Sequence, residues 1–289
     1  MTDHADREWR LIREESRPGP LQMALDEVAA ETAAAGGPRT VRVYRWAPSC
    51  LSMGYGQAVD TVDWDHCESA GVDVTRRQTG GGGIYHDNEG DIAYSIAAPA
   101  EELPGELIES YHELCPPILD GFARLGVDAD FVEEERPSIY QPACYLRGLH
   151  PAHDVVSDGG AGRKLAGNAQ YRRKDAVIQH GSITYDSRPE AHLAVFSEPD
   201  VTVEQFGERV AGITDIVDVA ERSSAGNQKS PISGDVSREE AVDAFESALG
   251  EWADAEEGDW TDEELERGRE IAAEKYESEA WVRERDAER

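Results

Sequence analysis

Lysine is scarce in this chain of 289 residues, which otherwise uses arginine as its basic residue; the lysines are Lys164, Lys174, Lys229 and Lys275. Acidic residues number 60 against 28 basic ones, which gives a formal net charge of −32. Such a surface repels phosphate backbones, so we expect no binding of nucleic acid. An excess of Asp and Glu with little lysine is typical of a halophilic protein, because a Debye length of about 3 Å at 1 M salt screens the self-repulsion. The alternative is an acidic protein from an ordinary mesophile.

Long hydrophobic runs are also missing. No apolar stretch approaches the roughly 20 residues that span a bilayer, and MTDHADREWR at the start contains no apolar signal core, so we expect a cytoplasmic protein without membrane contact. The cysteines form no CxxC pair, and neither disulfides nor a metal site are expected. The four cysteines are Cys50, Cys67, Cys115 and Cys144. We expect them to remain separate thiols, one of which is a candidate for a special role.

Local patterns predict helices and strands that do not alternate strictly. Apolar periodicity predicts helices over residues 20–35, 60–70, 105–125, 237–252 and 261–276, and strands over 40–46, 50–53, 72–76, 91–97, 154–156 and 176–184. Residues 133–151 contain three prolines and match neither pattern, which is typical of a functional segment. We therefore predict an α+β fold with a mixed, largely antiparallel sheet flanked by helices.

A glycine-rich loop is the most informative segment, because residues 76–87 read RRQTGGGGIYHD. Glycine lacks a Cβ and is tolerated in series only where the chain turns sharply or passes close to something. The N–H groups of such a loop can cradle an anion or a linear ligand, and Arg76 and Arg77 add positive charge. The alternative is a long hairpin turn with two solvated arginines. His86, which follows the loop, is expected to fix it by hydrogen bonds.

A second motif, GRKLAGNAQYRRKDAVIQHGSI, occupies residues 162–183. Small residues around Lys164 would let a ligand approach its ammonium closely. This compact donor can serve an oxyanion, a carboxylate or a phosphate without the bulk of a guanidinium. A solvated hairpin lysine is the alternative. His180 lies in an apolar strand, where a histidine is more often a core residue than a catalyst.

Together these segments resemble the biotin/lipoate protein ligase superfamily, and specifically its lipoate-attachment branch. The resemblance covers nearly the whole chain and includes MALDE (23–27), VRVYRW (41–46), SMGYGQ (52–57), the two motifs above and EKYESEAW (274–281). It implies an α+β domain in which the glycine loop and the lysine-bearing hairpin enclose an acyl chain. We place the acyl-binding catalytic domain in residues 1–220, and an acidic helical C-terminal extension that packs on this domain in residues 221–289.

The resemblance also implies roles for individual residues. The loop wraps the carboxyl end of an octanoyl or lipoyl group, and Lys164 contacts the reacting carbonyl or an acyl phosphate. The product is an amide with a lysine of lipoyl domains (the E2 subunits of 2-oxoacid dehydrogenases) or of the glycine-cleavage H protein. The candidate acyl- and substrate-binding residues are Arg76, Arg77, Gly80, Gly81, Gly82, Gly83, His86, Gly167, Asn168, Ala169, His180 and Gly181.

Cys144 bears on the choice between two reactions known in this superfamily. Ligases use ATP and Mg²⁺ to make an acyl adenylate, whereas octanoyltransferases take the acyl group from acyl-carrier protein through an acyl-cysteine. Cys144 lies upstream of Lys164, where one subgroup of transferases places its nucleophile and ligases often read Asn-Asp. A thiolate is both a nucleophile and a leaving group, and Lys164 would favour the thiolate and stabilise the oxyanion.

We therefore predict an octanoyltransferase with catalytic Cys144 and Lys164 and no cofactor. The first alternative is an ATP-dependent lipoate-protein ligase acting through lipoyl-AMP. The second is a non-catalytic module that binds an acyl group or a carrier protein. His150 and His153 are both candidate bases, and the sequence selects neither. It also leaves open the acyl group, the acceptor protein and the oligomeric state.

Overall fold

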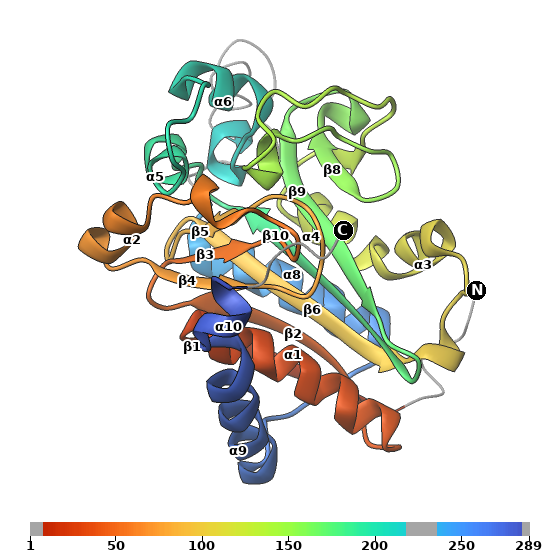
Figure 1. Cartoon of the computed structure of the whole chain (residues 1–289). Helices are drawn as coiled ribbons and strands as arrows, with labels where there is room; N and C mark the ends of the chain where they lie inside the picture. The colour runs from red at the N-terminus through yellow and green to blue at the C-terminus, as the bar shows by residue number, and fades with distance from the viewer. Residues whose placement is uncertain (1–7, 218–235, 285–289) are drawn as a thin grey trace.

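The computed structural model describes residues 8–217 and 236–284 of the chain. A long sheet crosses the molecule, and helices cover both of its faces (Figure 1). Within the described residues this sheet has eight strands in the order β11-β1-β2-β6-β10-β9-β8-β7. Their bounds are Trp9–Arg17 for β1, Arg39–Trp46 for β2, Asp91–Pro99 for β6, Ala129–Phe131 for β7, Asp154–Ser157 for β8, Lys164–Arg172 for β9, Ala176–Thr184 for β10 and Glu256–Glu257 for β11.

Both parallel and antiparallel pairs occur. Strand β1 is parallel to β2 and to β11, whereas the other neighbours in the long sheet are antiparallel. A smaller sheet contains β4 (Asp73–Arg76), β3 (Cys50–Met53) and β5 (Ile84–His86), in that order. Its central strand β3 is parallel to β4 and antiparallel to β5. The predicted α+β class with a mixed, largely antiparallel sheet is confirmed.

Alternation along the central strands divides the apolar side chains between two cores. On β2, Val41 and Val43 belong to the core that contains helices α4 (Pro116–Arg124) and α8 (Arg238–Ala253). Tyr44 and Trp46 belong to the core that contains α1 (Gly19–Ala34). Successive side chains of a strand point to opposite faces, so one segment supplies both layers. Figure 1 shows α1 on the near face of the sheet and α8 behind it.

The predicted helix over residues 105–125 is wrong in one respect, because the structure divides it in two. Helix α3 covers Leu107–Leu114, and α4 begins directly after Cys115. Pro116 and Pro117 occupy the first positions of α4. Proline lacks the N–H that a helix interior requires but is well tolerated in the first turn, so this pair ends one helix and begins the next.

Several other elements follow the predictions, and a few were not predicted. Helices α1 and α8 match closely, whereas residues 60–70 form a 3₁₀ turn followed by α2 (Trp64–Ala70), and residues 261–276 form α9 (Asp262–Ile271) and a π-helical turn. The helices and strands that were not predicted include β1, β5, β7, β9, β11, α5 (Pro189–Ala194), α6 (Val203–Arg209) and α10 (Glu279–Val282). None of the described helices is long and apolar enough to cross a membrane.

The described part of the C-terminal segment packs on the body of the molecule. Lys275 Nζ lies 2.7 Å from Glu27 of α1, and the Tyr276 hydroxyl donates to the same carboxylate at 2.6 Å. The predicted boundary between residues 220 and 221 lies outside the described ranges, so the division at that point stays a prediction.

Candidate active site

One cavity of about 400 Å³ gathers most of the predicted site residues. Its volume falls in the range of ligand-binding pockets, about 300–1,000 Å³. Part of its wall is apolar and is formed by Met23, Tyr44, Trp46, Ile84 and Tyr111. The predicted residues that line it are Arg77, Gly80, Gly81, His86, Cys144, Lys164, Gly167, Asn168, Ala169, His180 and Gly181. Segments far apart in sequence thus meet around one space.

Arg77 shapes the glycine loop from within. Its buried guanidinium donates to the carbonyl oxygens of Gly80 at 2.9 Å, Gly82 at 2.7 Å and Ser52 at 2.6 Å. These bonds close the loop over the arginine, so Arg77 organises the wall and is not a free cation. Gly81 has a φ of +98°, which a residue with a Cβ rarely adopts.

Cys144 is attached to this loop through the backbone. Its N–H donates to the carbonyl oxygen of Gly83 at 2.8 Å, and the Gly83 N–H donates to Pro142 at 2.7 Å. A Cβ on Gly82 would lie 2.4 Å from the Pro142 carbonyl oxygen, and one on Gly81 would lie 3.5 Å from Cys144 Sγ. The close approach requires glycine, and it brings the thiol to the cavity wall.

The remaining cysteines have a different environment. Cys50, Cys67 and Cys115 are buried and do not line the cavity, whereas Cys144 is half-buried. Burial raises the pKa of Cys67 to about 11 and that of Cys115 to about 12. Burial also raises the pKa of Cys50 well above its ordinary value. These thiols fill space in the core, and Cys144 is the cysteine that a ligand in the cavity can reach.

Lys164 forms a buried ion pair beside the thiol. Its Nζ lies 2.7 Å from Asp154 Oδ1 and 5.1 Å from the centroid of the Tyr145 ring. Burial opposes the charge, but Asp154 and then Cys144 raise the pKa of Lys164 above its ordinary value. Burial likewise opposes ionisation of Asp154, yet Lys164 and His153 lower its pKa. The site therefore holds a charged ammonium at the cavity surface.

Sequence reasoning missed Asp154 as a site residue. It begins β8, which was predicted as a strand, and its other oxygen accepts the His150 N–H at 2.8 Å. A carboxylate at the start of an otherwise apolar strand was the available signal, because a buried carboxylate needs a cation or several donors. Its partner could not be read from the sequence, since β8 and β9 pair with a shifted register.

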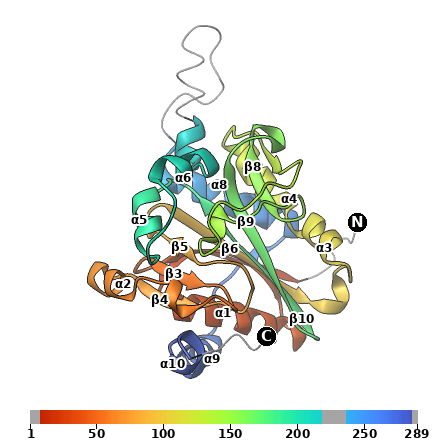
Figure 2. The same cartoon turned by 45° about the horizontal axis from the view of Figure 1, so that its top comes forward.

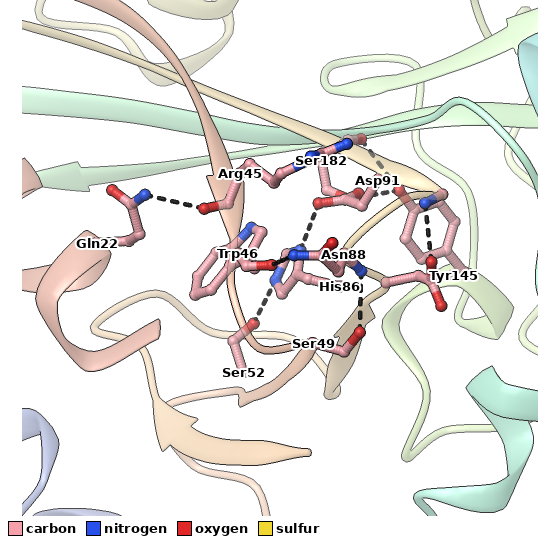
Figure 3. Close-up of polar contacts among 12 residues, drawn as sticks. Gln22, Arg45, Trp46, Ser49, Ser52, His86, Asn88, Asp91, Tyr145 and Ser182 are labelled. Carbon is pink, nitrogen blue, oxygen red and sulfur yellow. Dashed lines mark hydrogen bonds and ion pairs between the residues drawn. The ribbon is translucent and has the colours of Figure 1, made fainter. Parts of the chain in front are cut away.

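His86 lines the cavity, and Figure 3 shows its polar contacts. Its Nδ1 lies 2.9 Å from Asp91, its Nε2 lies 2.8 Å from Ser52 Oγ, and its ring stacks on Trp46 with centroids 4.0 Å apart. Burial lowers the pKa of His86 although Asp91 opposes this. Because the Ser52 carbonyl accepts from Arg77, His86 supports the glycine loop through Ser52.

The same network continues to the residue after Cys144. Asp91 also accepts a hydrogen bond from Ser182 Oγ, and the Tyr145 hydroxyl lies 2.8 Å from that oxygen (Figure 3). The Tyr145 ring contacts the Lys164 ammonium. These polar residues were not predicted, because the strand pairing that joins them is not visible in the local sequence.

His180 and Asn168 connect the second motif to its surroundings. His180 Nε2 lies 3.0 Å from Thr79 Oγ1 of the glycine loop, and Asn168 accepts from the Tyr94 hydroxyl at 2.6 Å. A Cβ on Gly181 would lie 2.3 Å from the Tyr94 ring, so this position requires glycine. His180 is half-buried, is hydrogen-bonded and lines the cavity.

Arg76 does not take part in the cavity, and its predicted substrate-binding role is corrected. Its buried guanidinium donates to the carbonyl oxygens of Gly54 at 2.9 Å, Gln57 at 2.8 Å and Val282 at 2.9 Å. It ends β4, and the side chain of the next residue points the opposite way. Gly82 and Gly83 also lie outside the lining and serve backbone packing. In residues 8–217 and 236–284, no group of three or more His, Cys, Asp or Glu residues is placed to hold a metal ion.

Comparison with known proteins identifies the family. Residues 18–243 match the model of the lipoyl protein ligase A/B catalytic domain. The chain belongs to this family. Within the family, octanoyltransferase LipM from Kyrpidia tusciae is 33% identical over 279 residues, which cover 94% of this chain and 97% of the relative. Octanoyltransferase LipM from Geobacillus kaustophilus is 33% identical over 282 residues, and this match also covers 94% of this chain and 97% of the relative.

Solved structures show the same fold. Lipoate-protein ligase A bound with ATP has a TM-score of 0.73 and 25% identity, and the match covers 95% of this chain and 98% of that one. A bi-partite lipoate protein ligase from Thermoplasma acidophilum has a TM-score of 0.72 and 24% identity over 98% of both chains. These likenesses place the catalytic-domain fold over nearly the whole chain, as the sequence predicted.

Proposed function

We propose that this protein is an octanoyltransferase of lipoate metabolism that acts through an acyl-cysteine at Cys144. The observation that carries the proposal is the position of Cys144. It is the half-buried thiol in a cavity that it shares with Lys164 and the glycine loop. The named activity of the full-length relatives supports the same reaction.

The first half-reaction moves the acyl group from the donor to the enzyme. The Cys144 thiolate attacks the carbonyl carbon of an octanoyl thioester on acyl-carrier protein, and the donor sulfur leaves and takes up a proton. A thiolate replaces a thiolate, so the exchange is nearly isoenergetic and needs no ATP. In the second half, the amine of an acceptor lysine attacks the acyl-cysteine, loses a proton and forms the amide, and Cys144 leaves as a thiolate.

Lys164 and the glycine loop would stabilise the oxyanion of both tetrahedral intermediates. The ammonium is buried, paired with Asp154 and close enough to Cys144 for their charges to interact. Gly80 and Gly81 line the same cavity, and no carbonyl or side chain of the described residues accepts from their N–H groups. Preorganised donors of this kind stabilise developing charge without reorganisation, and one such donor contributes about 10²–10³ in rate.

The apolar wall provides for the chain of the acyl group. Met23, Tyr44, Trp46 and Ile84 line the cavity together with the polar residues named above. Each buried methylene stabilises the bound acyl group by about 0.8 kcal/mol. The acyl chain in contact with this apolar wall would also limit the access of water to the acyl-cysteine.

An ATP-dependent lipoate ligase is the alternative reaction, with ATP and Mg²⁺ as its requirements. A structural neighbour is a lipoate-protein ligase bound with ATP. The thiol at Cys144 and the transferase names of the relatives favour the reaction without ATP. The acyl-carrier protein as donor, lipoyl domains or the H protein as acceptor, and a cytoplasmic, salt-rich setting are parts of our proposal.

Intact-mass analysis with octanoyl-carrier protein tests the acyl-enzyme directly. We expect wild type to gain the mass of one octanoyl group and Cys144→Ser to gain none and to lose transfer. Cys67→Ser is the matched control, because Cys67 is buried outside the cavity, and it should still acylate. Wild-type protein that gains no octanoyl mass but releases pyrophosphate from ATP when lipoate is added would support the ligase instead.

A further inference from the structure

Three arginines beside the cavity differ from most arginines of the chain. Elsewhere the described arginines commonly pair with carboxylates, as Arg238 does with Glu14 at 2.6 Å. Eight arginines have no carboxylate partner among the described residues; five of them are Arg76, Arg77, Arg163, Arg172 and Arg283, and the other three are Arg136, Arg147 and Arg209. In a protein with a net charge of −32, three such cations on one side of the site call for a reason.

Backbone carbonyls hold two of these arginines in place. Arg136 donates to Ala161 at 2.6 Å and to Gly162 at 2.5 Å, and Arg209 donates to Pro137. A guanidinium carries five N–H donors, so these bonds fix its position and leave donors free. A carbonyl oxygen also leaves the positive charge uncompensated, whereas a carboxylate would neutralise it.

Arg147 lies closest to the proposed chemistry. It lines the cavity together with Cys144, and its backbone N–H donates to the Cys144 carbonyl at 3.3 Å. Its half-buried guanidinium has no hydrogen-bond or ion-pair partner within residues 8–217 and 236–284. Arg147 and Arg77 interact electrostatically. Burial lowers the pKa of Arg77, and the positive charge of Arg147 lowers it further.

The fold brings the three arginines to one side of the site. Helix α6, which ends at Arg209, lies beside the segment that contains Arg136 and Arg147 (Figures 1 and 2). Arg136 exchanges backbone hydrogen bonds with Leu149, two residues after Arg147. Residue Val210 forms a bridge to Lys164. Burial first, and then the charge of Arg136, lower the pKa of Arg209, so these two cations interact.

Carboxylates also lie near these arginines: Glu133, Glu134 and Glu208 are their neighbours in sequence, and the charge of Asp154 acts to raise the pKa of Arg209. Asp154 pairs with Lys164, and Glu135 lies 3.4 Å from His150 Nε2. Like charges that are close together and only half-exposed repel one another unless an anion binds between them. Guanidinium groups suit a phosphate because their planar donors bind its oxygens in pairs.

We propose that Arg136, Arg147 and Arg209 bind the phosphate of the 4′-phosphopantetheine arm that carries the octanoyl thioester. The inference rests on the proposed function, because this arm is the usual thioester carrier in both acyl-carrier protein and coenzyme A. The arm would place its thioester at Cys144 while its phosphate remains at the arginines. No bond to phosphorus is made or broken.

Two small donors that differ only in the phosphate test this site. Octanoyl-4′-phosphopantetheine and octanoyl-pantetheine are compared by the rate of acyl-enzyme formation at low donor concentration and about 0.1 M salt, where screening is moderate. We expect wild type to prefer the phosphorylated donor by about tenfold or more, as for hydrogen bonds to a charged group. In the double variant Arg136→Gln with Arg209→Gln, this ratio should fall to near one. Arg267→Gln, whose arginine pairs with Glu31 and Glu270, should keep the wild-type ratio.

The ratio separates binding from a structural role, because a damaged fold would slow both donors and leave the ratio unchanged. An unchanged ratio in the double variant, or equal rates of the two donors in wild type, would overturn the phosphate site and leave the acyl-cysteine intact. If neither donor acylates the protein, the proposed function fails and the inference fails with it. To identify the source of the arm, octanoyl-carrier protein and octanoyl-coenzyme A are run in parallel. If the carrier protein is the source, wild type should be acylated faster by octanoyl-carrier protein than by octanoyl-coenzyme A. The double variant should then lose more of its acylation rate with octanoyl-carrier protein.

Discussion

Two buried aspartate–cation pairs contact the same active-site region and differ in what they do. Asp154 and Lys164 lie 2.7 Å apart beside Cys144, and Asp26 and Arg42 lie 2.7 Å apart beneath His180. In each pair burial opposes ionisation of the aspartate, and the cation lowers its pKa. The chemistry of the two pairs is therefore alike.

The difference lies in the surroundings of the cation. Arg42 is fully enclosed between α1 and β2 and also donates to the Gln22 side chain at 2.9 Å and to Ser95 Oγ at 3.0 Å. Lys164 lines the cavity, and within the described part of the chain it has one ion-pair partner, Asp154. A cation whose donors are all used supports the scaffold, whereas one with free donors at a cavity surface can bind a substrate. Charge and burial alone do not separate the two roles.

Breaking the enclosed pair should have the largest effect, and that effect should be on stability. Arg42→Met leaves Asp26 buried without its cation, which typically costs about 3–5 kcal/mol. Urea unfolding monitored by tryptophan fluorescence measures the loss. The double variant Arg42→Met with Asp26→Leu is the matched control and should recover most of it, since an apolar pair needs no compensation. If the single and double variants are equally stable, Asp26 does not depend on Arg42.

Breaking the pair in the cavity should instead reduce the reaction rate of folded protein. Lys164→Met removes the ammonium and keeps a chain of similar length, and we expect acyl-enzyme formation to slow by about 10²–10³-fold. The rate is measured by intact mass and divided by the folded fraction. Folded Arg42→Met should stay within a few-fold of wild type on the same scale. A comparable loss of rate in both variants would contradict the division into a scaffold pair and a reactive pair.

The contrast between these pairs also explains what the sequence could predict. Lys164 and Cys144 were found because a rare lysine among glycines and a cysteine in an irregular segment are local signals. The alternating apolar residues of β2 and β6 likewise predicted the sheet. The Asp154–Lys164 pair was not predicted, because it depends on the shifted register between β8 and β9.

Adjacent arginines show the same limit of sequence-based prediction. Arg76 and Arg77 have equal charge and stand next to each other just before the glycines, and the sequence assigned both to the ligand. The structure places Arg77 in the cavity wall and Arg76 against backbone carbonyls of residues 54–57 and 281–282. Partners more than 200 positions away decided the role of Arg76.

Acidification provides the finest test of the reactive pair. In wild type the pKa of Asp154 is lowered, so the pair adds stability above the ordinary aspartate pKa of about 3.9 and loses it as pH falls through the folded value. In Lys164→Met, burial without the ammonium should raise that pKa, so the buried carboxylate destabilises the fold at neutral pH and ceases to do so once it is protonated. As the pH falls from about 7 to about 4, the stability gap between the two proteins should therefore narrow by about 1.4 kcal/mol for each pH unit below the raised pKa of the variant.

Urea unfolding of both proteins at several pH values measures this gap. His150 and His153 lie beside Asp154 and are present in both proteins, which therefore differ in sequence only at residue 164. Wild type compared with Arg42→Met gives the parallel gap for Asp26, whose pKa is also lowered by its cation. We expect both gaps to narrow with acid, because the electrostatics of the pairs are alike, although their effects on the reaction rate differ. A gap that stays constant for Lys164→Met would mean that Lys164 does not keep Asp154 ionised, and its ammonium would then lack the fixed position that stabilisation of an oxyanion requires.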